Sequence, residues 1–182
     1  SLIPALMTFI VIPYGSHVPV LRAIARATKV RCVVEFGSGR YSTRALLEPG
    51  YFPELEELVS LESSESWAKD TAARNRDYRL KVLLTSLDNF VNVEVGKSDI
   101  ALIVCGESIQ DYKYRAELLK HHQGDQEGFV VLHDVEDGGL MTATERSSFR
   151  FRRYFEPMGY AAPSTGVFSN QPIPNLEKYL NW

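Results

Sequence analysis

The sequence VRCVVEFGSGRYSTRALL, residues 30–47, decides the fold class of this chain. Residues 30–36 are mostly apolar and rich in β-branched side chains, which predicts a buried β-strand. Gly37 ends this run. Together with Gly39 it lets the backbone turn sharply and approach a ligand closely, because a Cβ atom would collide there. The same two glycines also fit a plain tight turn.

Short apolar runs and helical patterns alternate along the rest of the chain. The apolar runs predict further strands at residues 58–61, 78–84, 100–105, 129–132 and 167–168. The helical patterns predict helices at residues 65–72, with Ser64 as N-cap, at 111–122, and from the capping box 142–145 through Phe149, Phe151, Tyr154 and Phe155. Residues 90–95 fit either a strand or a helix and stay unassigned. This alternation predicts a mostly parallel sheet with helices on both faces.

The composition is that of a soluble globular protein. A length of 182 residues has room for one domain, spanning 1–182, and 20 Lys and Arg against 23 Asp and Glu give a net charge of −3. This balance argues against a nucleic acid partner held by a large uniform phosphate-binding surface, although a local basic patch is compatible with it. Cys32 and Cys105 lie in apolar runs, which predicts buried free thiols and a reducing compartment. We therefore expect a cytoplasmic protein.

The most apolar stretch, residues 2–12, is too short to span a bilayer and is interrupted by Pro4. It also lacks the basic region and the cleavage site of a signal peptide. We expect no membrane partner. Residues 1–17 are expected to pack on or beside the domain, either as a docking element for a second subunit in a homodimer or as a helix that covers the sheet.

Polar residues follow several predicted strands, at the sheet edge where open parallel sheets bind their ligands. They are Glu35 with residues 37–39, then Glu62 and Ser63, Thr85 and Ser86, Cys105, and His133 with Asp134. At the end of the second strand, the Glu62 carboxylate can accept hydrogen bonds from both ribose hydroxyls of an adenosine ligand. It also fits the acidic first turn of a helix, which the helix dipole favours. The glycine turn and Glu62 together favour an adenosine-binding site.

Two other nucleotide-binding patterns are disfavoured. The dinucleotide fingerprint requires a third glycine where this chain has Ser42, and no Gly-Lys-Ser/Thr sequence follows to form a P-loop. A nicotinamide-dependent enzyme therefore ranks below the other hypotheses.

Five segments resemble, in family order, the motifs of class I S-adenosylmethionine-dependent methyltransferases. Residues 33–47 (VVEFGSGRYSTRALL) resemble the first motif, and residues 59–67 (VSLESSESW) resemble the acidic motif at the end of the second strand. Residues 99–119, 128–137 and 164–170 are similar to the fourth, fifth and closing strands with their flanks. The nearest subgroup is the small-molecule O-methyltransferases.

The resemblance implies a Rossmann-like α/β fold with a seven-stranded sheet in the order 3-2-1-4-5-7-6 and an antiparallel last strand. It also implies S-adenosylmethionine as cofactor, S-adenosylhomocysteine as its product, and a small-molecule substrate. Gly37, Ser38 and Gly39 would line the methionine part of the cofactor, with Glu35 behind the turn and Glu62 on the ribose. Ser63, Ser86 and Leu87 would border the adenine, and Cys105 would lie near the sulfonium.

The chain departs from the metal-dependent members of this family. Cys105 and Ser108 stand where those relatives have a magnesium-binding Asp and a Lys base, and His133 with Asp134 replaces an Asp-Asn pair. A thiol, an imidazole and one carboxylate suit magnesium poorly. We expect no metal here, unless acidic residues elsewhere rebuild the site; the candidates are Glu107, Glu136 and Asp137.

The general base is then His133 or Asp134. A purely structural role for His133, hydrogen-bonded to a neighbouring loop, is an equal alternative. The leading hypothesis is methyl transfer to an oxygen of a small molecule, and the second is a non-catalytic binding or partner module with the same fold.

Two further features have structural interpretations. His121 and His122 end a predicted helix, where the helix dipole favours imidazolium. Residues 146–153 include four arginines, which fit a solvated helix face over buried Phe149 and Phe151 better than an RNA-binding surface.

Overall fold

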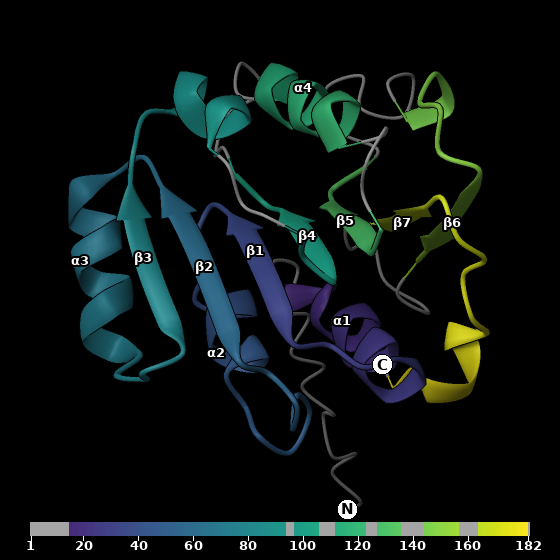
Figure 1. Cartoon of the computed structure of the whole chain (residues 1–182), viewed down its shortest axis with the longest axis horizontal. Coiled ribbons are helices and arrows are strands. Elements are labelled where there is room, and N and C mark those ends of the chain that lie inside the picture. The colour runs from purple at the N-terminus through teal and green to yellow at the C-terminus, as the bar shows by residue number, and fades with distance from the viewer. Residues whose placement is uncertain are drawn as a thin grey trace, which may run out of the picture.

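The computed structural model describes residues 15–93, 97–105, 112–122, 127–135, 144–156 and 164–181. Its strands form one seven-stranded sheet in the order β3-β2-β1-β4-β5-β7-β6. The strands are β1 Cys32–Phe36, β2 Glu57–Glu62, β3 Leu80–Leu84, β4 Ile100–Ile103, β5 Phe129–His133, β6 Phe151–Phe155 and β7 Thr165–Ser169. Neighbours from β3 to β5 are parallel, and β7 is antiparallel to both β5 and β6. The predicted strand order and directions are confirmed (Figure 1).

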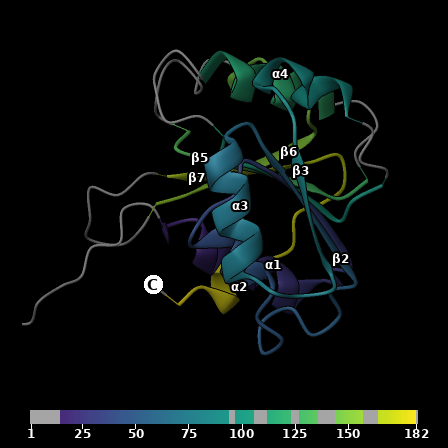
Figure 2. The ribbon, with the colours of Figure 1, turned by 90° about the vertical axis from the view of Figure 1, so that its left-hand side faces the viewer.

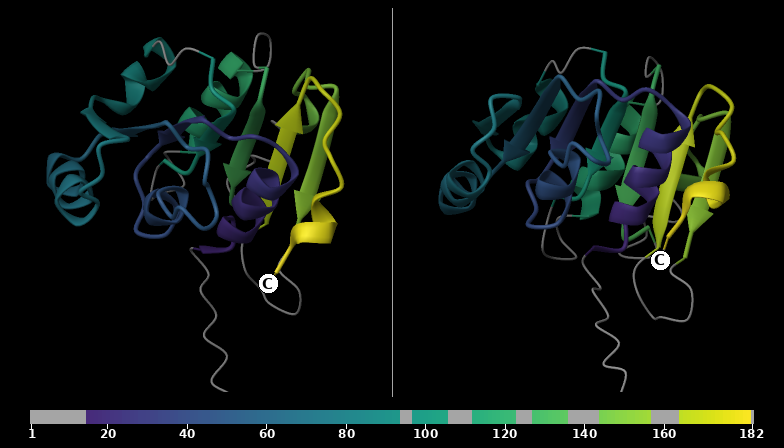
Figure 3. Two further views of the ribbon diagram at one scale, coloured as in Figure 1. Left: turned by 60° about the horizontal axis from the view of Figure 1, so that its bottom comes forward. Right: turned by 90° about the horizontal axis from the view of Figure 1, so that it is seen from below.

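Helices cover both faces of the sheet. They are α1 Val18–Ala27, α2 Ser42–Leu46, α3 Glu65–Arg74 and α4 Tyr112–His122, with the 3₁₀ helices η2 Leu87–Asn92 and η5 Leu176–Tyr179. One apolar cluster includes α1, α2 and η5, and a second includes α4 and η2. Figure 2 accordingly shows α4 on the side of the sheet opposite α1 and α2, and Figure 3 shows α1 beside η5. Among the described residues, no helix is long and apolar enough to cross a membrane.

Asp99 and Gly128 fix where the central strands begin. Asp99 Oδ2 accepts hydrogen bonds from the backbone N–H groups of Arg31 and Cys32, at 2.7 and 2.9 Å, and so ties the start of β1 to the start of β4. At the start of β5, a Cβ atom on Gly128 would lie 2.1 Å from the carbonyl oxygen of Asp99, so only glycine fits. These contacts bring the carboxyl ends of β1, β4 and β5 to the same edge of the sheet.

Glu35 is a fully buried acidic side chain in β1, between β2 and β4. Its carboxylate accepts hydrogen bonds from the hydroxyls of Thr43 and Ser60, both at 2.7 Å, and a short one from Ser42. Ser42 and Thr43 begin α2, whereas Ser60 lies in β2. Glu35 therefore joins β1, β2 and the helix that follows the glycine turn, which agrees with its predicted position behind that turn.

The predicted helix beyond residue 142 is wrong over its C-terminal part. Residues 151–155 form β6, paired with β7 from Phe151↔Ser169 to Phe155↔Thr165. Residues 144–145 are helical, and residues 142–143 lie outside the described residues. Aromatic side chains favour strands, and the sheet pairing with β7 overrides the capping signal. Phe149 is buried as predicted, but the Phe151 side chain is 38% exposed.

Other predicted boundaries shift by a few residues. The third strand begins at Leu80 rather than at residue 78, because Asp77 accepts a hydrogen bond from the backbone N–H of Arg79 and holds a turn there. The unassigned segment contains the end of η2, while residues 94–96 lie outside the described part of the chain. The predicted N-terminal segment also lies outside it up to residue 14. Among the described residues, neither Cys32 nor Cys105 forms a disulfide; Cys105 is buried as predicted, whereas Cys32 is only partly buried.

We predict that Glu35→Gln removes a pH dependence of stability. Burial, the largest cause, raises the pKa of Glu35 from 4.5 to about 7, although hydrogen bonds from Ser42, Thr43 and Ser60 oppose it. The unfolded chain therefore loses this proton first, so the folded state loses stability as pH rises from 4.5 to 7. This shift corresponds to about 3 kcal/mol.

Urea unfolding of the wild type and of Glu35→Gln between pH 4.5 and 8 tests this. The free energy of unfolding of the variant, minus that of the wild type, should increase by up to about 3 kcal/mol over this range. Taking this difference removes the contribution of the histidines to the free energy of unfolding, because they titrate in both proteins. A difference that stays constant with pH would show that Glu35 is ionised in the fold throughout.

Candidate functional site

The glycine turn lies against the end of β4. Gly37 has a φ of 92°, a left-handed conformation, and its N–H donates to the carbonyl of Leu61 at 2.8 Å. A Cβ atom at Gly37 would lie 2.6 Å from Cys105 Cα, so a side chain cannot be accommodated. The N–H of Gly39 donates to Thr43 Oγ1 at 3.1 Å, which joins the end of the turn to α2. The left-handed backbone and the close neighbour therefore require glycine at position 37. That neighbour is Cys105 of the protein itself, whereas the sequence analysis expected a ligand.

Glu62 is a buried carboxylate that already has four donors. Oε2 accepts from the N–H and the hydroxyl of Ser38, at 3.0 and 2.9 Å. Oε1 accepts from the N–H groups of Ser63 and Ser64, at 2.9 and 3.1 Å. Glu62 thus fixes the glycine turn to the end of β2. The predicted N-cap of α3 is confirmed, because the Ser64 hydroxyl accepts a hydrogen bond from the N–H of Trp67.

These four donors determine whether the Glu62 carboxylate can also accept a hydrogen bond from a ribose. A carboxylate offers about four acceptor positions, and all four are used here. Three of the donors are backbone N–H groups, but the Ser38 hydroxyl can turn. It already lies 2.9 Å from Thr71 Oγ1, which is an alternative partner. One ribose hydroxyl can therefore replace Ser38 on Glu62, and the donor set fits an adenosine cofactor with that single rearrangement.

The predicted adenine residues lie at the ends of β2 and β3. The backbone N–H of Thr85 donates to the Glu62 carbonyl at 2.9 Å, so these two strand ends are side by side. Ser63 and Ser86 are exposed and Leu87 is half-buried. Two exposed hydroxyls beside a partly accessible apolar side chain suit the edge and the face of an adenine ring.

Arg115 joins the end of β4 to the end of β5. From α4, its Nε donates to the carbonyl of Cys105 at 2.5 Å and its Nη1 donates to the carbonyl of His133 at 3.1 Å. Its Nη1 also lies 3.7 Å from Asp134 Oδ2, and the Arg115 side chain is 3% exposed. Cys105 therefore contacts the glycine turn on one side and is bridged to His133 on the other. The sequence predicted these residues to lie at the same edge of the sheet, but it gave Arg115 no part in linking them.

His133 and Asp134 form a buried pair. His133 Nε2 lies 3.2 Å from Asp134 Oδ1, and Asp134 has a φ of 56°, a conformation that non-glycine residues seldom adopt. This contact meets the distance of an ion pair but not the geometry of a hydrogen bond, so it does not fix the tautomer of the ring. Nδ1 is buried and has no hydrogen-bond partner among the described residues. Burial, followed by the charges of His17 and Arg115, lowers the pKa of His133 well below its usual value.

His17 completes this cluster and was missed by the sequence analysis. It precedes α1, and its ring centroid lies 4.4 Å from that of His133. Both of its ring nitrogens are buried without a hydrogen-bond partner in the described part of the chain. Burial and the nearby Arg115 charge lower its pKa to about 4, so it is neutral at pH 7. No motif marks this residue, because only the packing of α1 on the sheet brings it to the end of β5.

Two expectations about other charged residues change. His122 is packed against the Phe36 ring, with centroids 5.3 Å apart, and burial lowers its pKa to about 4. The prediction that the helix end favours its imidazolium form is therefore wrong. Of the arginines at residues 146–153, two belong to β6, where Arg152 Nη1 donates to the carbonyl of Thr144 and Arg153 pairs with Glu177. They do not form a helix face.

Among the described residues, no cluster of three or more His, Cys, Asp or Glu side chains could hold a metal ion. Four of the positions that bear on the metal site of metal-dependent methyltransferases lie outside the described residues. These are Glu107, Ser108, Glu136 and Asp137.

Comparison with solved structures shows the fold. The methyltransferase domain of bacterial CtHen1-CN superposes with a TM-score of 0.61 at 12% identity, over 86% of this chain and 99% of that domain. The N-methyltransferase NodS from Bradyrhizobium japonicum gives 0.56 at 13% identity, over 86% of this chain and 94% of that one. Spermidine synthase from Thermotoga maritima gives 0.57 at 14% identity, over 92% of this chain but 62% of its own length.

The sequence matches no protein-family model and no curated protein. The strand order and the structural likeness show that the chain has the class I methyltransferase fold, and this assignment rests on structure alone. At 12 to 14% identity, neither the acceptor atom nor the substrate follows from these likenesses.

We predict that Gly37→Ala lowers the free energy of unfolding by about 2 kcal/mol or more, because the new Cβ meets Cys105 and the φ of Gly37 is left-handed. Gly50→Ala is the matched control, since its nearest neighbour would be a Glu48 side-chain oxygen at 3.8 Å. Chemical denaturation of both variants measures the difference. Equal stabilities would show that the turn does not lie against β4 as described.

Proposed function

We propose that this protein is an S-adenosylmethionine-dependent methyltransferase that transfers a methyl group to an oxygen of a small molecule. The observation that supports it most is a continuous set of contacts at the carboxyl edge of the sheet. The glycine turn packs on Cys105, and Arg115 bridges Cys105 to His133. A cofactor-binding turn and a candidate base are thus adjacent, at the edge where parallel sheets bind their ligands.

The cofactor would be held by the residues that the sequence singled out. Gly37, Ser38 and Gly39 offer close backbone approach to its methionine part, and Cys105 lies beside this turn. Glu62 would accept a ribose hydroxyl in place of the Ser38 hydroxyl. The adenine would be bordered by Ser63, Ser86 and Leu87. When bound, S-adenosylmethionine supplies an electrophilic methyl group, so positioning provides much of the rate.

His133 would act as the general base for the acceptor hydroxyl. Its lowered pKa keeps the imidazole neutral at pH 7, and its buried Nδ1 has no hydrogen-bond partner among the described residues, so this nitrogen is available to accept a proton. Nδ1 would accept the proton of the acceptor hydroxyl. The cofactor would supply the methyl group to the oxygen and would leave as neutral S-adenosylhomocysteine, because the bond between that carbon and sulfur breaks. The Asp134 carboxylate, 3.2 Å from Nε2, would stabilise the resulting imidazolium by its charge.

A second candidate is a non-catalytic member of the same fold that binds a ligand or partner. The four donors on Glu62 favour it, because the carboxylate is complete without a cofactor. A methyltransferase should bind the cofactor and turn over an acceptor, whereas a non-catalytic module should show no turnover.

Cofactor binding is tested by thermal and chemical unfolding with S-adenosylhomocysteine and with NAD. At 100 times its dissociation constant, S-adenosylhomocysteine should raise the free energy of unfolding by about 2.7 kcal/mol. NAD should have a much smaller effect. A larger stabilisation by NAD, or none by either ligand, would contradict the proposal.

The variants Glu62→Gln and Ser38→Ala separate the ribose contact from the structural role of Glu62. Glu62→Gln should weaken S-adenosylhomocysteine binding by about tenfold and also lower stability by about 1–3 kcal/mol, because an amide N–H would face backbone N–H groups. Ser38→Ala removes only the hydroxyl that a ribose would replace and should keep the affinity. Calorimetry measures both. Unchanged affinity in Glu62→Gln would limit Glu62 to fixing the turn.

We predict that His133→Asn abolishes turnover on hydroxylated acceptors while keeping S-adenosylhomocysteine affinity within about threefold. His121→Asn is the control, since His121 is exposed at the end of α4. A panel of small hydroxylated compounds, assayed for S-adenosylhomocysteine release in excess chelator, gives the readout.

Full turnover in His133→Asn would exclude His133 as the general base. Activity that returns only with magnesium would show that a metal site replaces it, and no turnover with tight cofactor binding would favour the non-catalytic module.

A further inference from the structure

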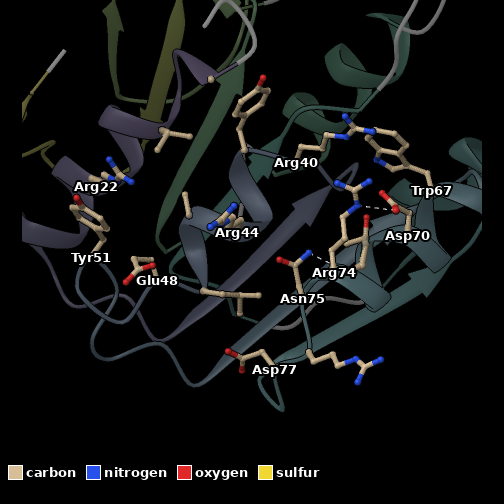
Figure 4. Close-up of a pocket in the computed structure, with 18 of the residues that line it drawn as sticks. Arg22, Arg40, Arg44, Glu48, Tyr51, Trp67, Asp70, Arg74, Asn75 and Asp77 are labelled. Carbon is tan, nitrogen blue, oxygen red and sulfur yellow. Dashed lines mark hydrogen bonds and ion pairs between the residues drawn. The ribbon is translucent and has the colours of Figure 1, made fainter.

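A broad groove lies between α1, α2 and α3 (Figure 4). Its volume of about 1180 Å³ exceeds the usual range for small-molecule pockets, roughly 300–1,000 Å³. Gly39 and Trp67 line it beside the glycine turn, and Asp77 lines it beyond the end of α3. Gly39 is the only residue that it shares with the proposed cofactor site.

The groove carries an excess of positive charge. Its charged lining residues are Arg22, Arg40, Arg44, Arg74 and Arg76, against Glu48, Asp70 and Asp77. Two of the acids are already paired, because Asp70 lies 2.7 Å from Arg74 Nε and Asp77 lies 2.7 Å from Arg79 Nη2. Hydrogen bonds from Arg79 lower the pKa of Asp77 to about 2. Within the described part of the chain, the other four arginines of the groove form no ion pair with a carboxylate.

Two of these arginines are held by aromatic rings. Arg22 Cζ lies 3.7 Å from the centroid of the Tyr51 ring, and Arg40 Cζ lies 5.6 Å from that of Trp67. Stacking orients a guanidinium group but leaves its in-plane N–H donors unused. Arg22 Nε is buried and has no hydrogen-bond partner among the described residues. In Figure 4, Arg44 projects between the two stacked pairs.

From this arrangement we propose that the groove binds a phosphate-bearing ligand through Arg22, Arg40 and Arg44. A guanidinium group donates two parallel hydrogen bonds to phosphate oxygens, and a preoriented one loses less side-chain entropy on binding. Two sources share this chemistry: a free phosphorylated small molecule, and the phosphodiester chain of a single-stranded oligonucleotide. The sequence does not reveal the site, because its arginines and aromatic residues come from α1, the glycine turn before α2, α2 itself, the loop after α2, and α3.

The proposal does not depend on methyl transfer, so it is tested by equilibrium binding. The chain has two tryptophans, and in the Trp182→Phe background Trp67 is the only indole. Trp67 emission then reports on titrations with inorganic pyrophosphate and with single-stranded oligothymidylate. We expect saturable binding of at least one probe at 50 mM salt, weakening strongly towards 200 mM because the contact is ionic.

The double variant R40A/R44A should weaken binding at least tenfold, as the loss of charge-assisted hydrogen bonds predicts. The control R146A/R150A removes the same charge from exposed positions elsewhere and should stay within twofold. Calorimetry gives affinities that do not depend on the Trp67 signal. If R40A/R44A fails to fold, R22K replaces it, since it keeps the charge but loses the paired donors.

The two probes also identify the source of the phosphate. Tighter binding of the oligonucleotide, with a steeper loss in salt, supports a phosphodiester chain, and equal binding supports a free phosphorylated molecule. Absence of saturable binding by either probe, or equal losses in the two double variants, would overturn the proposal. Displacement of the probe by saturating S-adenosylhomocysteine would also overturn it, because the groove would then belong to the cofactor site.

Discussion

The buried Glu35 carboxylate is the interaction on which the rest of the site depends. It lies within the sheet, and its hydrogen-bond donors among the described residues are hydroxyls from α2 and β2. An unsatisfied buried carboxyl group would be strongly unfavourable, so these hydroxyls must stay in place. The start of α2 is thereby held against β1 and β2, and the glycine turn between them has little freedom. The turn is thus preorganised by a side chain that lies behind it.

From this turn, contacts extend in two directions along the carboxyl edge. Towards β2, Glu62 binds the backbone of the turn and of the next helix. Towards β4 and β5, Gly37 packs on Cys105, and Arg115 carries the connection to His133. The proposed cofactor side and the proposed acceptor side are therefore connected through buried groups.

The sequence predicted most of the fold, because the strand signals lie in apolar runs that only a central strand can bury. It failed at residues 151–155, where aromatic residues with helical spacing form an outer strand whose pairing with β7 is a long-range effect. It located Glu35, Gly37 and Glu62 from local chemistry but could not show that Glu62 is saturated. His17 and Arg115 were invisible to it, since their positions depend on how helices pack on the sheet. The arginine groove was missed for the same reason.

A crystal structure with S-adenosylhomocysteine tests the central claim most directly. The account predicts the ligand in the turn of residues 37–39, with one ribose hydroxyl on Glu62 in place of the Ser38 hydroxyl and the Ser38 side chain turned to Thr71. The Glu35 hydrogen bonds should be unchanged. A ligand bound elsewhere, or a turn that keeps all four donors on Glu62 and holds no ligand at saturating concentration, would contradict it.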